Sequence, residues 1–92
     1  MPPVKGEKLQ QLHKQVPDWD VVDEHHLSRT FKFPDFAAAL EFVNRVGAVA
    51  EQEAHHPEIF LTWGRARIEI HTHKIDALTD SDFILAAKID QL

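Results

Sequence analysis

Apolar residues recur along the chain in two periods, the three-to-four-residue period of helices and the two-residue period of strands. Near the N-terminus, Leu9, Leu12 and Val16 follow the helical period within a polar stretch. This spacing predicts a first helix over residues 5–15. Pro17 ends the helix, because proline cannot continue its hydrogen-bond ladder.

The next segment follows the strand period. Trp19–Val22 is short, apolar and β-branched, which predicts a strand. From Leu27 to Phe33, mainly apolar residues alternate with polar ones, as in a half-buried strand. Asp23–His25 predicts a turn between the two strands, so we expect them to pair antiparallel.

The longest amphipathic stretch predicts a helix that begins after Asp35 and ends at about Glu53 or Ala54. Asp35 can cap it, because a carboxylate accepts from the free N–H groups of the first turn. Pro57 disfavours helical backbone angles at His56, so the chain must leave the helix there. The predicted apolar stripe of this helix comprises Phe36, Ala39, Leu40, Val43, Val46 and Ala50.

The last third of the chain predicts a second hairpin and a third helix. Strands are expected at Ile59–Trp63 and Ala66–Thr72, joined by Gly64-Arg65 as a type II′ turn. Thr79–Asp82 resembles a capping box, which predicts a final helix from Asp80 to about Gln91. The order α-β-β-α-β-β-α predicts an α+β fold, a four-stranded antiparallel sheet with three helices on one face.

Composition narrows the class of protein. The 92 residues carry 10 Lys plus Arg against 15 Asp plus Glu, and this acidity argues against direct binding of a nucleic-acid backbone. Without cysteine, neither disulfides nor cysteine-ligated metals can form. The length suits a single domain over 1–92. With no apolar run approaching the ~20 residues of a membrane span and no signal-peptide core, we expect a cytoplasmic protein.

Histidines are the residues most suggestive of chemistry. Of seven, four fall within 19 residues, at the predicted ends of the long helix and the last strand: His55, His56, His71 and His73. Ends of rigid elements commonly carry functional sites. The other three follow no pattern, and we expect them on the surface: His13, His25 and His26.

Glu51 precedes His55 by four residues, so the two would share a helix face. The carboxylate would orient the imidazole and raise its pKa, which suits a general acid or base. A solvated ion pair at the helix end explains the same spacing.

His71 and His73 would share one strand face. Either this face is polar and exposed to solvent, or the two histidines are metal ligands in a set completed by His55 or His56. A structural role also explains Asp82, because the third residue of a capping box accepts from a backbone N–H. Trp63 is likewise explained as an aromatic residue that packs in the hairpin or the core.

The spacing of these residues resembles the signature of pterin-4a-carbinolamine dehydratases. The signature here begins at Glu51, continues through His55-His56-Pro57 and Trp63, and ends with His73 and Asp82. The resemblance extends over nearly the whole chain from about Leu9. It implies the same fold and an enzyme that dehydrates 4a-hydroxytetrahydropterin to quinonoid dihydropterin.

The resemblance also implies the biological setting. Family members recycle the pterin cofactor of aromatic amino-acid hydroxylases, above all phenylalanine hydroxylase. They form homodimers or homotetramers and need no metal or organic cofactor. The mammalian member also binds a homeodomain transcription factor as a dimerisation cofactor. An alternative for this chain is therefore a non-catalytic dimeric scaffold, assembly factor or transcriptional coactivator with the same fold.

Residue by residue, the resemblance implies three catalytic histidines and two supporting acids: His55, His56, His73, Glu51 and Asp82. It implies that the pterin contacts His55, His56, Pro57, Trp63, His71, Thr72 and His73. Two positions depart from the family pattern, Ala77 where glycine is common and His71 where a small residue is common. Our hypothesis is that His55 and His73 exchange protons with the pterin while His56 positions it. Glu51 would then orient His55, and Asp82 would orient a histidine.

Overall fold

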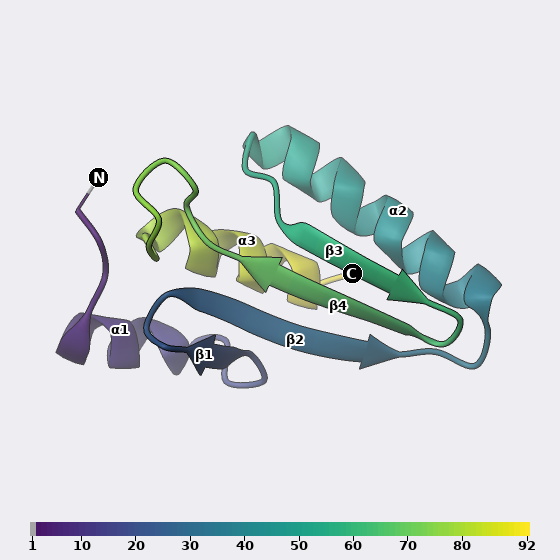
Figure 1. The fold of residues 1–92 in the computed structure, drawn as a ribbon, viewed down its shortest axis with the longest axis horizontal. Helices are drawn as coiled ribbons and strands as arrows, with labels where there is room; N and C mark the ends of the chain where they lie inside the picture. The colour runs from purple at the N-terminus through teal and green to yellow at the C-terminus, as the bar shows by residue number, and fades with distance from the viewer. Residues whose placement is uncertain (1) are drawn as a thin grey trace.

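The fold is known from a computed structural model that describes residues 2–92; Met1, the first residue of the predicted domain, lies outside the described residues. The predicted order of elements is confirmed (Figure 1). The elements are α1 (Gly6–His13), β1 (Asp20–Val22), β2 (His26–Lys32), α2 (Phe36–Glu53), β3 (Glu58–Thr62), β4 (Arg65–Ile70) and α3 (Asp80–Asp90).

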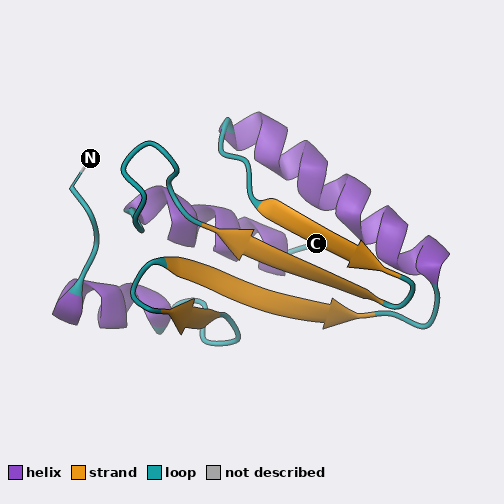
Figure 2. Cartoon of the chain, in the orientation of Figure 1, coloured by secondary structure: helices purple, strands orange, loops and turns teal. Residues whose placement is uncertain are grey.

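The four strands form one antiparallel sheet in the order β1-β2-β4-β3. Leu27 pairs with Ile70, and Glu58 pairs with Glu69. The start of β2, the end of β4 and the start of β3 therefore lie at the same end of the sheet. Figure 2 shows that the turn before β2, the loop after β4 and the segment before β3 gather there.

The core lies between one face of the sheet and the helices. Alternate residues of β4 are fully buried, and α3 contributes a mainly buried helix across that face (Figure 1). Trp19 is also fully buried, and its indole Nε1 donates to Asp90 Oδ1 at 2.8 Å. His13 Nε2 lies 2.5 Å from the Trp19 carbonyl, so His13 is half-buried rather than exposed on the surface. The largest buried apolar side chains are Trp19, Leu27, Ile68, Ile70, Leu78, Leu85 and Ile89.

Helix α2 presents a different stripe to the core than the periodicity predicted. Ala39, Val46 and Ala50 are buried as expected. Phe36 and Leu40, however, are 44% and 40% exposed. The contact stripe is rotated toward Phe42, whose ring packs 4.5 Å from that of Phe31. The helix therefore carries apolar residues on an outer flank as well.

The predicted type II′ turn is wrong. Thr62 pairs with Arg65, so the two-residue loop is Trp63-Gly64, and neither residue has a positive φ. Gly64 is instead favoured by a close approach, because its carbonyl accepts from Phe33 N–H and an added Cβ would lie a tight 3.1 Å from the Phe33 oxygen.

Among the described residues, no helix combines the length and apolar character needed to cross a membrane.

Candidate active site

The C-terminus of α2 aims His55 back toward α3. Ala54 takes the left-handed conformation (φ 51°), its N–H donates to the Glu51 carbonyl, and His55 N–H donates to the Ala50 carbonyl. These bonds form a Schellman motif, the commonest way to end a helix with a sharp change of direction. The motif brings His55 to the start of a helix that lies 27 residues later in the chain.

Asp82 is the buried centre of the site. Its side chain is fully buried, and Oδ1 lies 2.5 Å from His55 Nε2. Oδ2 accepts from the Thr79 backbone N–H at 2.7 Å and from the Thr72 hydroxyl at 2.9 Å. Thr79 and Asp82 form the predicted capping box of α3. Asp82 therefore fills its structural role and still offers its second oxygen to a histidine.

Glu51 pairs with His56 rather than with His55. Its Oε1 lies 3.0 Å from His56 Nε2, and both side chains are largely exposed. The predicted four-residue helical pairing of Glu51 with His55 is wrong, because helical geometry ends before Ala54 and the reversed backbone turns His55 toward Asp82. The hypothesis that Asp82 orients a histidine agrees with this contact, and the histidine is His55.

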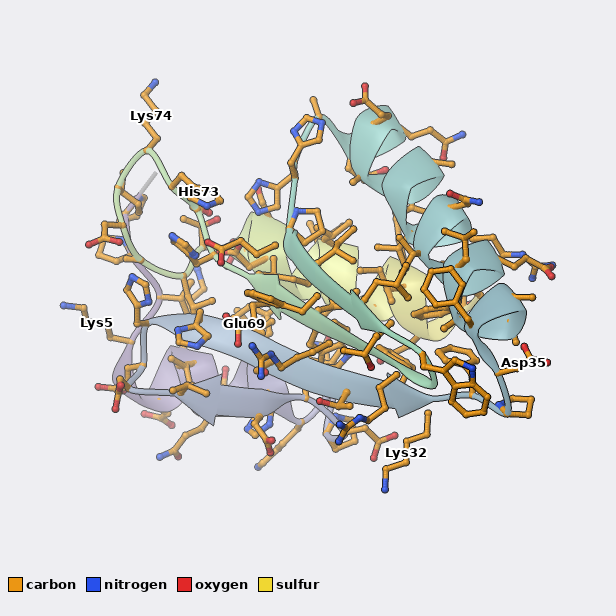
Figure 3. All side chains as sticks on the ribbon, turned by 45° about the vertical axis from the view of Figure 1, so that its right-hand side comes forward. Lys5, Lys32, Asp35, Glu69, His73 and Lys74 are labelled. Atoms are coloured by element: carbon orange, nitrogen blue, oxygen red, sulfur yellow. The ribbon has the colours of Figure 1, made fainter. Side chains whose placement is uncertain are left out.

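His73 stands on the loop that follows β4. The strand ends at Ile70, earlier than predicted, so His71 and His73 belong to the loop rather than to one strand face. His73 Nε2 lies 3.6 Å from Glu58 Oε1 at the start of β3. Figure 3 shows His73 on this loop, with Lys74 extending away from the sheet. No local pattern pointed to Glu58, because its contact with His73 depends on the pairing of β3 with β4.

The three candidate histidines thus each face a carboxylate, and the pairs differ in burial. Only the His55–Asp82 pair is buried, with the His55 side chain 17% exposed against more than half for His56 and His73. Thr72, directly before His73, binds the same Asp82 carboxylate that holds His55. The end of α2 and the loop after β4 are therefore fixed to one buried group.

Of the expected substrate contacts, Pro57 lies with the histidines but Trp63 does not. Trp63 forms the tip of the β3–β4 hairpin and is 68% exposed. The five residues of β3 separate it from Pro57, so six steps of 3.3 Å put the two residues roughly 20 Å apart. Within one chain, Trp63 is therefore at the opposite end of the sheet from the histidines.

His25 and His26 join the histidine-rich end of the sheet, although the sequence predicted them to be surface residues without a pattern. Both are half-buried, and His25 Nδ1 lies 3.1 Å from His26 Nδ1. The His25 and His71 rings lie 4.7 Å apart, and those of His71 and His73 lie 4.1 Å apart. Burial lowers the pKa of His71, and the nearby charges of His73 and His25 lower it further. His25 donates to Asp76 and so lowers the pKa of that carboxyl.

Metal ligands are available at this end of the sheet, but not in the set that the sequence suggested. Among the described residues, neither group able to hold an ion includes His55 or His56. The two groups share one histidine and consist of His25, His71 and Asp76, and of Glu58, His71 and His73.

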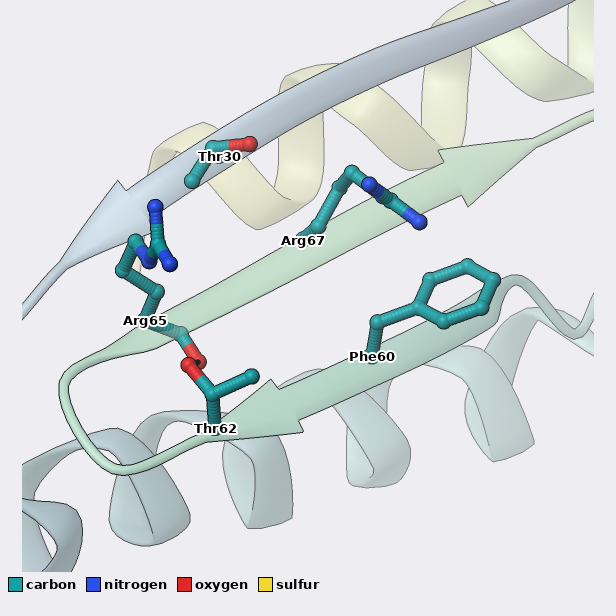
Figure 4. Close-up of a pocket in the computed structure, with 5 residues that line it drawn as sticks. All are labelled: Thr30, Phe60, Thr62, Arg65 and Arg67. Atoms are coloured by element: carbon teal, nitrogen blue, oxygen red, sulfur yellow. Dashed lines mark hydrogen bonds between the residues drawn. The ribbon is translucent and has the colours of Figure 1, made fainter.

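A shallow pocket of about 320 Å³ lies elsewhere, on the open face of the sheet (Figure 4). It is lined by Thr30, Phe60, Thr62, Arg65 and Arg67. The Arg67 guanidinium stacks on the Phe60 ring at 4.3 Å, so this cation is already engaged. None of the predicted site residues lines this pocket.

Comparison with known proteins agrees with the resemblance noted from the sequence. A family model described as pterin 4 alpha carbinolamine dehydratase matches residues 2–92. The chain belongs to this dehydratase family. Curated relatives named pterin-4-alpha-carbinolamine dehydratase include a Rubrobacter xylanophilus protein, 60% identical over 100% of this chain and 86% of the relative. An Alkaliphilus metalliredigens relative is 44% identical over 98% of this chain and 82% of its own.

Solved structures extend the comparison to the dehydratase fold. A transcriptional coactivator/pterin dehydratase from Brucella melitensis superposes with a TM-score of 0.90 at 27% identity, covering 98% of this chain and 97% of the other. A pterin dehydratase-like RuBisCO assembly factor of the alpha-carboxysome superposes with a TM-score of 0.64 at 19% identity, covering 79% and 83%. The second likeness concerns the fold alone.

Proposed function

We propose that the protein dehydrates a 4a-hydroxytetrahydropterin to quinonoid dihydropterin and water. In this elimination the C4a–O bond breaks and the hydroxyl leaves as water after it receives a proton. N5 loses its proton, and its electrons form the new double bond to C4a. The reaction therefore needs a proton donor and a proton acceptor on the same substrate, and imidazoles titrate in the right pH range for both roles.

His55 is the best-positioned proton-exchanging group. The Asp82 carboxylate accepts hydrogen bonds at both oxygens, so the neutral His55 ring places its proton on Nε2 and leaves Nδ1 as the acceptor. A buried carboxylate that fixes the orientation and tautomer of a histidine is the arrangement that makes histidine a base in hydrolase triads. This buried pair is the observation that carries the proposal.

His73 and His56 complete the proposed machinery. His73 supplies the second proton-exchanging ring from the loop after β4, where its Nε2 lies 3.6 Å from Glu58 Oε1. His56 is exposed and held by Glu51, which suits a residue that positions the pterin or its hydroxyl. The chemistry as proposed uses no metal or organic cofactor.

The pathway and assembly state are proposed from the family. A dehydratase of this kind would recycle the cofactor of an aromatic amino-acid hydroxylase such as phenylalanine hydroxylase. The exposed apolar flank of α2 and the two edge strands, β1 and β3, offer surfaces on which copies of the chain could form a homodimer or homotetramer.

The direct test is the dehydration rate of synthetic 4a-hydroxytetrahydropterin with His55→Gln and His73→Gln. Each change removes one proton-exchanging ring, so we expect kcat to fall by roughly 10²–10⁴-fold. Lys74→Gln is the matched control, because Lys74 neighbours His73 but extends away from the sheet, and its rate should equal that of the unmodified protein.

Two results would contradict the proposal. One is an unmodified protein that gives no acceleration over the uncatalysed dehydration, which would favour a non-catalytic scaffold or coactivator of the same fold. The other is near-native turnover in both histidine variants, which would place the proton transfers on other residues.

A further inference from the structure

We propose that His25, His71 and Asp76 form a binding site for a divalent transition-metal ion of the Zn²⁺ type, beside the proposed pterin site. His25 comes from the turn before β2, whereas His71 and Asp76 come from the loop between β4 and α3. The topology of the sheet brings them together, although 46 residues separate His25 from His71 in the chain.

The ligand atoms are nearly in coordination geometry without an ion. His25 Nε2 lies 2.8 Å and His71 Nε2 lies 3.9 Å from Asp76 Oδ1, and the three ligand atoms all lie within 4.8 Å of one another. Around a tetrahedral zinc with bonds of about 2.0–2.1 Å, neighbouring ligand atoms lie about 3.3 Å apart. Small side-chain rotations would therefore suffice to close the site.

His25 already has the outer partner that metal-binding histidines use. A ligating histidine normally donates its second ring N–H to an acceptor, which fixes the tautomer and directs the lone pair at the ion. His26 Nδ1 lies 3.1 Å from His25 Nδ1 and can accept this proton. His25 Nε2, which donates to Asp76 in the metal-free chain, would release its proton when the ion binds and offer its lone pair to the metal.

The backbone around the ligands holds unusual conformations that fix their positions. Asp76 has a φ of 52°, and its N–H donates to the His73 carbonyl. Asp23 and Glu24, directly before His25, also have positive φ values. Positive φ is unfavourable for a non-glycine residue, so both turns hold a conformation that the surrounding contacts must stabilise.

The ligand set indicates the class of ion. Two imidazoles and one carboxylate suit Zn²⁺, whereas Mg²⁺ and Ca²⁺ prefer oxygen ligands. The Asp76 side chain is 83% exposed, so solvent could complete the coordination. The alternative group, Glu58, His71 and His73, is weaker, because its second imidazole is 58% exposed against 35% for His25. That imidazole also lies 3.6 Å from its carboxylate, whereas His25 lies 2.8 Å from Asp76.

The test is a titration of the full chain, first freed of metal by a chelator, with Co²⁺ as an optical probe and then with Zn²⁺ by calorimetry. We expect one ion per chain, visible absorption bands of four-coordinate Co²⁺, and displacement of Co²⁺ by Zn²⁺. Asp76→Asn and His25→Gln should each weaken Zn²⁺ binding by more than the roughly tenfold cost typical of losing an outer partner.

Asp76→Asn is the decisive variant, because asparagine keeps the size of the side chain and tolerates positive φ. Asp80→Asn is its matched control, an exposed carboxylate at α3 paired with Lys8, and should bind Zn²⁺ like the unmodified chain. Circular dichroism of each variant checks the fold. The proposal is overturned by the absence of saturable binding, by unchanged affinity in Asp76→Asn, or by affinity lost in His73→Gln but retained in His25→Gln.

Discussion

Asp82 links the chemistry of the site to the stability of the fold. It closes the capping box of α3, binds Thr72 of the preceding loop and holds His55 through its other oxygen. Because the carboxylate is fully buried, each of these bonds replaces a hydrogen bond to water that the folded protein cannot make. Removing the charge therefore affects the helix start and the histidine together.

The variant Asp82→Asn separates the charge of this residue from its size. An amide offers only one acceptor oxygen. Either its NH₂ group faces the Thr79 N–H and Thr72 hydroxyl, which lose their acceptor, or it faces His55 Nε2, which can no longer donate to this side chain. We expect the free energy of unfolding to fall by about 1–3 kcal/mol and the dehydration rate to fall as well. Urea denaturation and the dehydration assay measure the two effects, and full stability with full activity would contradict the assigned network.

His71 makes the stability of the metal-free chain depend on pH. Its pKa is lowered by burial and by His73 and His25, so the folded state binds fewer protons at this site than the unfolded state. Stability is then highest above the unfolded pKa of about 6.5 and falls as pH drops through that value toward the lowered folded pKa. The pKa of the Asp76 carboxyl is also lowered, but this group reduces the stability of the fold only below about pH 4, where it takes up its proton.

The variant His71→Gln should reduce this dependence. With a chelator present, we expect urea denaturation of the unmodified chain to show lower stability at pH 5.5 than at pH 7.5, and a smaller difference in the variant. An identical pH dependence in both proteins would show that other groups control it.

The pairing of the acids with the histidines could be predicted only in part from the sequence. The sequence identified Glu51 and Asp82 as acids near the histidines, but paired Glu51 with the wrong ring. The four-residue rule holds only inside a helix, and Ala54 leaves helical geometry one residue before His55. Nothing in the local pattern marks an alanine as left-handed, because glycine is the usual residue there.

The end of α2 carries local strain at Ala54. An L-residue in the left-handed region costs about 1–2 kcal/mol, whereas glycine adopts it freely but loses more entropy on folding. The helix ends as it does because the Schellman hydrogen bonds and the buried His55–Asp82 contact offset this cost. The end of α2 is therefore determined by the contact between His55 and Asp82 rather than by the helix propensity of its own residues.

Substituting Ala54→Gly should stabilise the protein by up to about 1 kcal/mol, which is a few degrees in Tm for a domain of this size. Ala48→Gly is the matched control, because the same change inside α2 should destabilise by roughly 0.5–1 kcal/mol. Thermal denaturation of both variants measures the difference, and a destabilised Ala54→Gly would contradict the role assigned to this turn.

Element boundaries were largely predictable, because caps and periodicity are local. Asp35 caps α2 through the Ala38 N–H, and α3 begins at Asp80, both as the sequence indicated. The hairpin turn was not predictable from its glycine, because Gly64 is favoured by the close approach of Phe33 rather than by its own φ. A long-range reason of this kind leaves no local pattern.

At the scale of the molecule, the exposed apolar residues of α2 suggest how copies assemble. Phe36 and Leu40 are separated by four residues, so they lie on one flank of the helix. We expect light scattering after gel filtration to give two or four chains per particle. Leu40→Glu should shift the particle toward smaller assemblies, because a charge cannot be buried in an apolar contact without cost.

Gln52→Glu is the matched control for that experiment, since it adds the same charge at an exposed position of α2 away from the flank formed by Phe36 and Leu40. It should leave the particle size unchanged. An unmodified protein that elutes as a single chain would contradict the assembly proposal, and an intact particle in Leu40→Glu would place the contact elsewhere, for example on an edge strand.

The histidine-rich end of the sheet was the least predictable part of the molecule. The sequence placed His71 and His73 together, although on a strand face rather than on the loop where they lie, and it gave no reason to add His25 and His26. Their proximity follows from the pairing of β2 with β4 across some forty residues of intervening chain. Such pairing depends on the order of strands in the sheet, which no local period encodes.

The double attachment of Asp82 constrains how this fold could lose its activity over evolution. A descendant that served only as a scaffold would gain nothing by keeping His55 or His73, yet replacing Asp82 would loosen the start of α3. We therefore expect inactive descendants to retain the aspartate after the histidines have drifted. In such lineages, the aspartate would be retained only because the start of α3 needs it for folding.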